Sequence, residues 1–406
     1  MTVNSLSENR VRKLALLGGA PAFNEQLHVG RPNLGRLDRF QELVNSIWER
    51  NWLTNAGPLV YEFEKRIADF AGVNECVCMC NATVALEIVA RALGLAGEVI
   101  VPSFTFVATA HSLQWQQIQP VFCDIDPVTH TLDPECIERL ITPRTSGIVG
   151  VHIWGRSCNV EALQDIARRR QLKLVFDAAH AFACSHRASM IGGFGNAEVY
   201  SFHATKFVNS FEGGAVVTND AELAQRMRLM RNFGFEGLDQ VGHVGTNGKM
   251  TEVSAAMGLT SLESMDAFVA QNFSNFQLYR CLLEGLPGIT VLDYDASERC
   301  NYQYVVLEVD EDYAGLSRDD LMAVLHAENI RARRYFWPGV HRMEPYRSLY
   351  PQSHLWLPNT ERVAGRVLLL PTGIAVTSSM VEKICDVVRT AIGEADAVSR
   401  MNLTLT

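Results

Sequence analysis

The chain has 406 residues, of which 48% are hydrophobic and 20% are charged, and its formal net charge is −9. This length predicts more than one domain, and the composition is typical of a globular protein rather than a disordered or low-complexity one. Nucleic acid is not expected as a partner, because a phosphate backbone is bound by a basic surface and this chain is acidic.

The N-terminal sequence MTVNSLSENRVRKLALLGG lacks the apolar core and cleavage site of a secretory signal, and no segment is long and apolar enough to span a bilayer. We therefore expect a soluble, cytoplasmic protein without a membrane partner. The ten cysteines include no CxxC pair, and Cys76, Cys78 and Cys80 alternate as on one face of a strand. Reduced thiols and no metal site are predicted, with a metal or iron–sulfur site as the alternative.

Short apolar runs alternate with helical patterns from residue 76 to residue 218. The residues 159–170 place Val160, Leu163 and Ile166 on one face and end in arginines, which predicts a helix. Strands that alternate with helices indicate a mostly parallel sheet. The predicted strands are 76–80, 99–102, 121–124, 148–151, 174–177, 199–202 and 215–218.

This alternation ends at residues 254–275, which we predict to form one long helix. The remaining C-terminal pattern indicates a smaller α+β domain. The fold class is thus α/β with a second domain. The predicted organisation is an N-terminal segment, a large domain, a small domain and a tail, at 1–34, 35–265, 266–395 and 396–406.

Polar residues follow four of the predicted strands, where ligands bind to open parallel sheets. Asn81 and Thr83 precede an apolar helical stretch, so the free N–H groups of its first turn could bind an anion, although an ordinary helix cap explains the same residues. Asp177 ends another strand, where it could face a protonated ring nitrogen or cap a helix.

Lys206 is followed by Phe207 and Val208, an apolar setting that lowers the pKa of an amine and makes it a nucleophile. A surface lysine with a buried stem is the alternative. Phe106 lies just beyond a third strand, where an aromatic ring is either part of the core or a surface for a flat ligand.

These four features together match what pyridoxal phosphate requires, namely a phosphate site, a carboxylate for the pyridine nitrogen, a stacking surface and a lysine. A dinucleotide is a poorer match, because no GxGxxG follows a strand.

The sequence resembles the nucleotide-sugar aminotransferases of the DegT/StrS family, within the fold-type-I pyridoxal-phosphate enzymes, over roughly residues 35–395. The resemblance implies a three-layer α/β/α domain that binds the cofactor and a smaller C-terminal domain. It is carried by these stretches: EVIVPSFTFVATAHSLQW, PVFCDIDPVTHTLDP, ITPRTSGIVGVHIWGR, FDAAHAF, YSFHATKFVNSFEGGAVVTND, RNFGF, GTNGKMTEVSAAMGL and RRYFWPGVHRMEPY.

By this resemblance, Lys206 is the lysine that carries the cofactor and Asp177 is the partner of its ring nitrogen. His180 would lie near the phenolic oxygen, where the family commonly has Gln, and Phe106 would stack on the ring. The implied phosphate ligands are Thr83, Val84 and Ser201 of one subunit and Asn247 or Lys249 of its neighbour, which implies a homodimer with shared active sites. Ala82 replaces a glycine of the family, which restricts the turn before the phosphate site.

The same stretches are most similar to enzymes that aminate C4 of dTDP-4-keto-6-deoxy-D-glucose with L-glutamate as donor, giving dTDP-4-amino-4,6-dideoxy-D-glucose for antibiotic deoxysugars. Arg331, Arg333 and His341 belong to a basic segment that would bind the diphosphate, unless it is only a solvated surface. The alternatives are a C3 aminotransferase of a dTDP-3-keto-6-deoxyhexose, a dehydratase, which the retained Lys206 disfavours, and a cofactor-binding regulatory protein without turnover.

Overall fold

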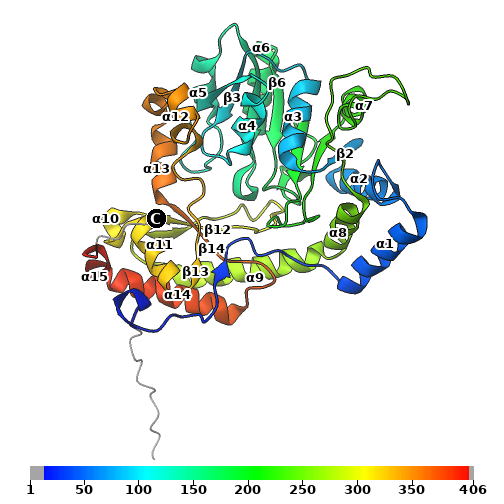
Figure 1. Ribbon diagram of the computed structural model, residues 1–406. Helices are drawn as coiled ribbons and strands as arrows, with labels where there is room; N and C mark the ends of the chain where they lie inside the picture. Colours follow the sequence, from blue (N-terminus) through cyan, green and yellow to red (C-terminus); the bar gives the residue numbers. More distant parts are fainter. Residues whose placement is uncertain (1–12, 402–406) are drawn as a thin grey trace, which may run out of the picture.

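The central element of the fold is a seven-stranded sheet with the strand order β2-β10-β9-β6-β5-β3-β4 (Figure 1). The structure is a computed structural model and describes residues 13–401. Only β10 runs antiparallel to its neighbours, so the predicted α/β fold with a mostly parallel sheet is confirmed. The strands are β2 (Glu75–Met79), β3 (Glu98–Pro102), β4 (Gln119–Cys123), β5 (Thr145–Val151), β6 (Lys173–Asp177), β9 (Ala197–Ser201) and β10 (Gly214–Thr218).

Helices cover both faces of this sheet (Figure 1). Cys76 and Cys78 face a core formed with α2 (Pro58–Ala71), whereas Val77 and Met79 face a core formed with α3 (Ala82–Ala92). This alternation along β2 buries both faces of the strand. Two further helices, α4 (Ala108–Gln114) and α7 (Ala221–Met230), join α3, and α6 (Val160–Arg170) packs on the face opposite to them.

The predicted long helix at 254–275 is two helices, α8 (Glu252–Glu263) and α9 (Met265–Leu283). Ser264 separates them with φ −104° and ψ 2°. Its backbone N–H donates to Ser261 O and its hydroxyl to Thr260 O, so local bonds replace the regular helical ladder there. No helix formed by residues 13–401 is long and apolar enough to cross a membrane.

A second, antiparallel sheet of β11 (Ile289–Val291), β12 (Val305–Val309) and β14 (Val367–Leu370) forms the smaller domain with α11 (Arg318–Ala327) and α14 (Ser378–Gly393). The N-terminal segment belongs to its core, because Leu14 and Leu27 pack there and β1 (Leu27–His28) pairs with β13 (Ile330–Arg331). Residues 1–12 of the predicted N-terminal segment and 402–406 of the predicted tail lie outside the described residues.

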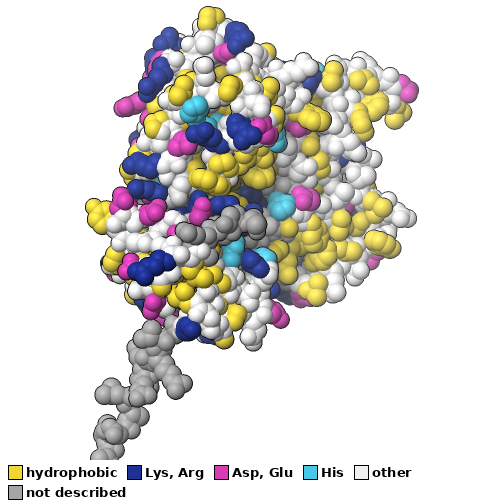
Figure 2. Space-filling model, turned by 60° about the vertical axis from the view of Figure 1, so that its left-hand side comes forward, with side chains coloured by type: hydrophobic (Ala, Val, Ile, Leu, Met, Phe, Trp, Pro, Cys, Tyr) yellow, Lys and Arg dark blue, Asp and Glu magenta, His cyan; other side chains and the backbone are white. Residues whose placement is uncertain are grey.

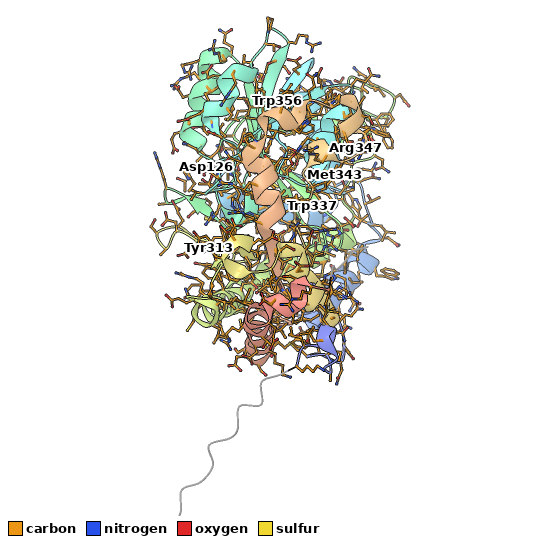
Figure 3. The ribbon with its side chains drawn as sticks, turned by 90° about the vertical axis from the view of Figure 1, so that its left-hand side faces the viewer. Asp126, Tyr313, Trp337, Met343, Arg347 and Trp356 are labelled. Carbon is orange, nitrogen blue, oxygen red and sulfur yellow. The ribbon has the colours of Figure 1, made fainter. Side chains whose placement is uncertain are left out.

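The C-terminal half returns once to the large domain, between Trp337 and Trp356 (Figure 3). Val340, Tyr346 and Leu357 are buried in the core formed with α3 and α4. From there α13 (Pro358–Arg366) leads back to the small domain, and Asp124 at the end of β4 caps it by accepting bonds from the N–H groups of Asn359 (3.0 Å) and Thr360 (2.8 Å). The C-terminal half therefore contributes residues to both domains, so neither domain is formed by one continuous stretch of sequence.

A buried ion pair ties α2 to the sheet and gives a stability prediction. Glu64 and Arg231, exposed by 5% and 6%, pair with each other, and Glu64 also accepts from Cys78 N at 2.8 Å.

Glu64→Gln should lower the free energy of unfolding by about 3 kcal/mol, because it leaves the arginine charge buried without its partner. Urea unfolding would measure this loss, with Glu62→Gln as the matched control. The pair of Glu62 with Arg66 on the same helix is exposed, so its free energy of unfolding should fall by less than about 0.5 kcal/mol. Equal losses in the two variants would contradict the prediction.

Candidate functional site

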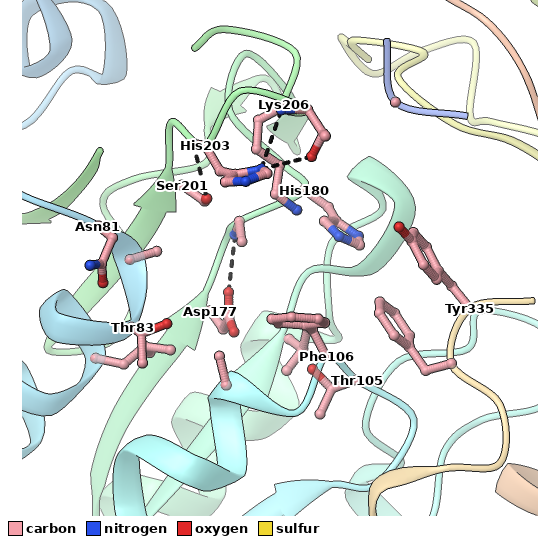
Figure 4. Close-up of a pocket in the computed structure, with 18 of the residues that line it drawn as sticks. Asn81, Thr83, Thr105, Phe106, Asp177, His180, Ser201, His203, Lys206 and Tyr335 are labelled. Carbon is pink, nitrogen blue, oxygen red and sulfur yellow. Dashed lines mark hydrogen bonds between the residues drawn. The ribbon is translucent and has the colours of Figure 1, made fainter. Parts of the chain in front are cut away.

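The main cavity opens at the carboxyl ends of the central strands, between the two domains (Figure 4). Its volume accessible to the centre of a water molecule is about 340 Å³. In Figure 4, Asn81 and Thr83 lie on one side, His180 and Tyr335 on the other, and Asp177 and Phe106 between them. The cavity thus brings together six of the twelve site residues predicted from the sequence, namely Thr83, Phe106, Asp177, His180, Ser201 and Lys206.

Asp177 is the last residue of β6 and is buried, with 6% of its surface exposed. Its Oδ2 accepts from the Thr109 hydroxyl at 2.7 Å and its Oδ1 from Ala179 N at 3.1 Å. Burial raises the pKa of this carboxyl, whereas the two donors and the charge of Lys206 oppose the shift. A cation or a protonated ring nitrogen in the cavity would therefore be stabilised by facing this carboxylate.

Lys206 lies in the loop after β9, beside the buried side chains of Phe207 and Val208. Its Nζ lies 3.4 Å from the hydroxyl of Tyr304, which comes from the small domain. Burial lowers the pKa of Lys206 to about 8, although the charge of Asp177 opposes the shift. At neutral pH a larger fraction of this amine is unprotonated than of an exposed lysine, and that form can act as a nucleophile or a base.

His180 is buried between the rings of Trp154 and Tyr304, at centroid distances of 5.7 Å and 4.4 Å. Its Nδ1 accepts from Trp154 N at 3.4 Å, which places the proton of the neutral ring on Nε2. Burial and the nearby Lys206 hold the pKa of His180 well below its ordinary value. The histidine is thus a neutral hydrogen-bond donor toward the cavity rather than a cation.

The first turn of α3 forms one wall of the cavity. The Asn81 side chain accepts from Val84 N at 2.9 Å, so that N–H is already bonded and Val84 does not line the cavity. The N–H groups of Ala82 and Thr83 have no partner within the helix, as at every helix start, and they can bind an anion. Thr83 and Ser201 both line this part of the cavity. Ala82 N, Thr83 and Ser201 are therefore placed where they could bind an anion, whereas Val84 N is bonded to Asn81.

Aromatic side chains from several segments line the cavity. Phe106 is 59% exposed, and its ring centroid lies 6.4 Å from that of Phe336. Phe336 and Tyr335, together with Tyr304, Val29 and Gly30, also line the cavity and were not predicted from the sequence. They come from the small domain and the N-terminal segment, and the only sequence signal for any of them is the stretch RRYFWPGVHRMEPY.

Two predicted residues, Asn247 and Lys249, lie away from the cavity of their own chain. Asn247 forms a bridge with Asn232, and Lys249 Nζ lies 3.2 Å from Asn232 Oδ1 and 4.5 Å from the centroid of Phe233.

The predicted basic residues Arg331, Arg333 and His341 do not line the cavity either. His341 is buried, and its ring bonds the Ser103 hydroxyl and the Glu361 carboxylate, both at 2.7 Å, so it joins the two domains. The Arg333 guanidinium lies 5.2 Å from the Tyr335 centroid, next to the cavity, whereas Arg331 is only partly buried on β13. On the face that Figure 2 draws, Lys and Arg side chains lie around a hollow, together with acidic side chains.

The residues in the cavity fit pyridoxal phosphate. They combine an amine with a lowered pKa, a buried carboxylate, free N–H groups at a helix start, an exposed aromatic ring and a neutral histidine donor. The turn that contains Ala82 packs directly against Gly214 of β10. This close approach is possible because Gly214 has no side chain, since an added Cβ would lie 2.5 Å from Ala82 N.

Comparisons with known proteins agree with this site. The model of the DegT/DnrJ/EryC1/StrS aminotransferase family matches residues 36–389. The chain is 38% identical to a dTDP-4-amino-4,6-dideoxy-D-glucose transaminase of Shigella dysenteriae, over 90% of this chain and 99% of the relative, and 36% identical to one of Escherichia coli, over 89% and 97%. A crystal structure of DesI in the presence of its TDP-sugar product superposes with a TM-score of 0.92 at 48% identity, over 96% of this chain and 99% of DesI.

Proposed function

Because the chain belongs to the DegT/DnrJ/EryC1/StrS aminotransferase family, we propose that it is the pyridoxal-phosphate enzyme that moves the amino group of L-glutamate to C4 of dTDP-4-keto-6-deoxy-D-glucose. The product is dTDP-4-amino-4,6-dideoxy-D-glucose. The observation that carries the proposal is that one cavity holds Lys206 and Asp177 in a chain 38% and 36% identical to transaminases named for that sugar.

The bound cofactor supplies an electron sink for the carbon from which a proton is removed. Lys206 would hold the cofactor, and its Nζ would take the proton from the donor carbon and return it later, a role that its lowered pKa favours. Asp177 would hold the proton of the ring nitrogen, and His180 Nε2 would donate to the ring oxygen. Phe106 would stack on the ring, while Ala82 N, Thr83 and Ser201 would bind the phosphate.

The position of the new amino group distinguishes the proposal from its alternatives. With glutamate and dTDP-4-keto-6-deoxy-D-glucose, NMR of the product should locate nitrogen at C4. Conversion of only the 3-keto isomer would establish the C3 aminotransferase instead. A protein that binds the cofactor but does not convert it to the amine form with glutamate would be the regulatory protein.

The lowered pKa of Lys206 gives a pH prediction. Only the unprotonated amine reacts with an aldehyde, so the apoprotein should capture pyridoxal phosphate at a rate that rises with pH and levels off above about pH 8. Stopped-flow absorbance would measure this rate. A lysine amide in solution, with a pKa of about 10.4, is the control and should still accelerate above pH 9. If the pH midpoint of the capture rate were as high for the protein as for the lysine amide, the effect of burial on the pKa of Lys206 would be contradicted.

We further propose that two copies of the chain share their active sites. Lys206 is the only Lys or Arg among the described residues that line the cavity, yet the cofactor and the sugar nucleotide both carry phosphate. Asn247 and Lys249 lie outside this cavity, and α1 (Leu37–Arg50) with the loop after it exposes Trp48, Trp52 and Leu53, by 74%, 46% and 58%. The free thiols of the described residues suit the reducing cytoplasm.

Subunit mixing tests this arrangement. Lys206→Ala and the double variant Asn247→Ala/Lys249→Ala should each be inactive, and a mixture refolded at equal amounts should regain about one quarter of the wild-type sites, because one site of each mixed dimer is intact. Sedimentation should give a dimer for all samples. Dimers without any regained activity would show that Asn247 and Lys249 serve their own chain.

A further inference from the structure

A second, smaller cavity lies behind Lys206, on the side of the small domain. It shares Val29, Gly30, Thr205, Lys206 and Tyr304 with the main cavity. Its other lining residues include Asn33, Asn272, Gln303 and Thr372. Its volume accessible to the centre of a water molecule is about 20 Å³. That is room for about one water molecule.

Asn272 lines this cavity and has a buried acceptor without a partner among the described residues. The side chain is 1% exposed, and its Nδ2 donates to Asn301 O at 2.9 Å, whereas its Oδ1 has no hydrogen-bond partner within residues 13–401. Exchanging the two amide atoms is no remedy, because it would place Oδ1 against the Asn301 carbonyl. Buried acceptors without a partner are rare, since they lose the water that solvates them in the unfolded chain.

The other walls offer what a water molecule bound to Asn272 Oδ1 would need. The Thr372 hydroxyl accepts from Asn275 Nδ2 at 3.3 Å and keeps its own hydrogen available, and Lys206 Nζ and the Tyr304 hydroxyl lie at the boundary with the main cavity. A buried water commonly makes about three hydrogen bonds. A water molecule that donates one bond to Asn272 Oδ1 and makes two more with the Thr372, Lys206 or Tyr304 groups would have these three bonds.

We propose that this cavity binds one water molecule through Asn272 Oδ1 and holds it beside Lys206 as the water consumed when the oxo acid leaves. The proposal rests on the proposed aminotransferase function. Release of the oxo acid breaks a carbon–nitrogen bond: the water oxygen becomes the carbonyl oxygen of the oxo acid, and the two water hydrogens end on the nitrogen that stays with the enzyme. When the keto sugar enters, the reverse step returns one water.

Crystal structures of the wild-type holoprotein and of Asn272→Leu test the site without measuring activity. At a resolution that displays other buried waters, the wild type should show density at hydrogen-bonding distance from Asn272 Oδ1, and the variant should lack it. Gln271→Leu, on the same helix, is the matched control because Gln271 does not line the cavity. An empty cavity in the wild type, or the same density in Asn272→Leu, would overturn the proposal.

Single turnovers with glutamate test the role. Asn272→Leu should release the oxo acid about tenfold more slowly, the effect of one lost hydrogen-bond partner. The isotope effect of Cα-deuterated glutamate should fall toward one, because bond cleavage by water then becomes slower than proton removal. A slower turnover with an unchanged isotope effect would indicate a distorted site and refute the role. If the wild type does not convert glutamate, the proposed function fails, while the density still decides the water site.

Discussion

Replacing Lys206 with alanine should reduce amino-group transfer by about 10⁴-fold or more and remove the visible absorbance of lysine-bound pyridoxal phosphate. The reason is that no other amine of the described residues lines the cavity, so neither the nucleophile nor the base is replaced. Purified protein titrated with the cofactor, followed by its spectrum and by the amination rate, measures both effects.

The exposed Lys173, at the opposite end of the central sheet on β6, provides the control for Lys206. Lys173→Ala should keep the spectrum and the rate of the wild type. A Lys206→Ala protein with an unchanged spectrum would mean that the cofactor is bound elsewhere, and the assignment of the cavity would be wrong. A lost spectrum with retained transfer would show that a different group moves the proton.

Asp177→Asn should lower the rate of transfer by about 10³-fold while the cofactor stays bound. The amide keeps the size of the side chain and its bond from Ala179 N, but it no longer carries the charge that holds a proton on the ring nitrogen. Without that proton the ring takes up less electron density from the reacting carbon. Single-turnover rates with glutamate would measure the loss, and a rate within tenfold of the wild type would contradict this role.

Thr109→Val separates the charge of Asp177 from its hydrogen bonds. The variant removes the donor at 2.7 Å from Oδ2, which helps to oppose the rise that burial imposes on the pKa of Asp177. The pKa should therefore rise further, and since the anion is the active form, the acidic limb of the pH–rate profile should move to higher pH. A limb that does not move would show that another group controls it.

Several parts of the fold could be predicted because their causes are local. The strands 174–177 and 199–202 are short apolar runs, and β6 and β9 lie within two residues of them. Asp177 ends the first of these strands and Lys206 lies a few residues after the second, so the order of the chain alone places them at the same edge of a parallel sheet. The break at Ser264 was missed, because it depends on hydrogen bonds of one serine that no apolar periodicity records.

The sequence by itself therefore determined the α/β fold, the strand-end residues and, through its resemblance, the cofactor and the family. Only the tertiary structure decided which side chains surround Lys206. Tyr304 and Asn272 reach it from the small domain, and His341 is directed away from it into a bond with Ser103. Positions of this kind depend on how segments distant in sequence pack against each other, and such packing leaves no pattern within either segment.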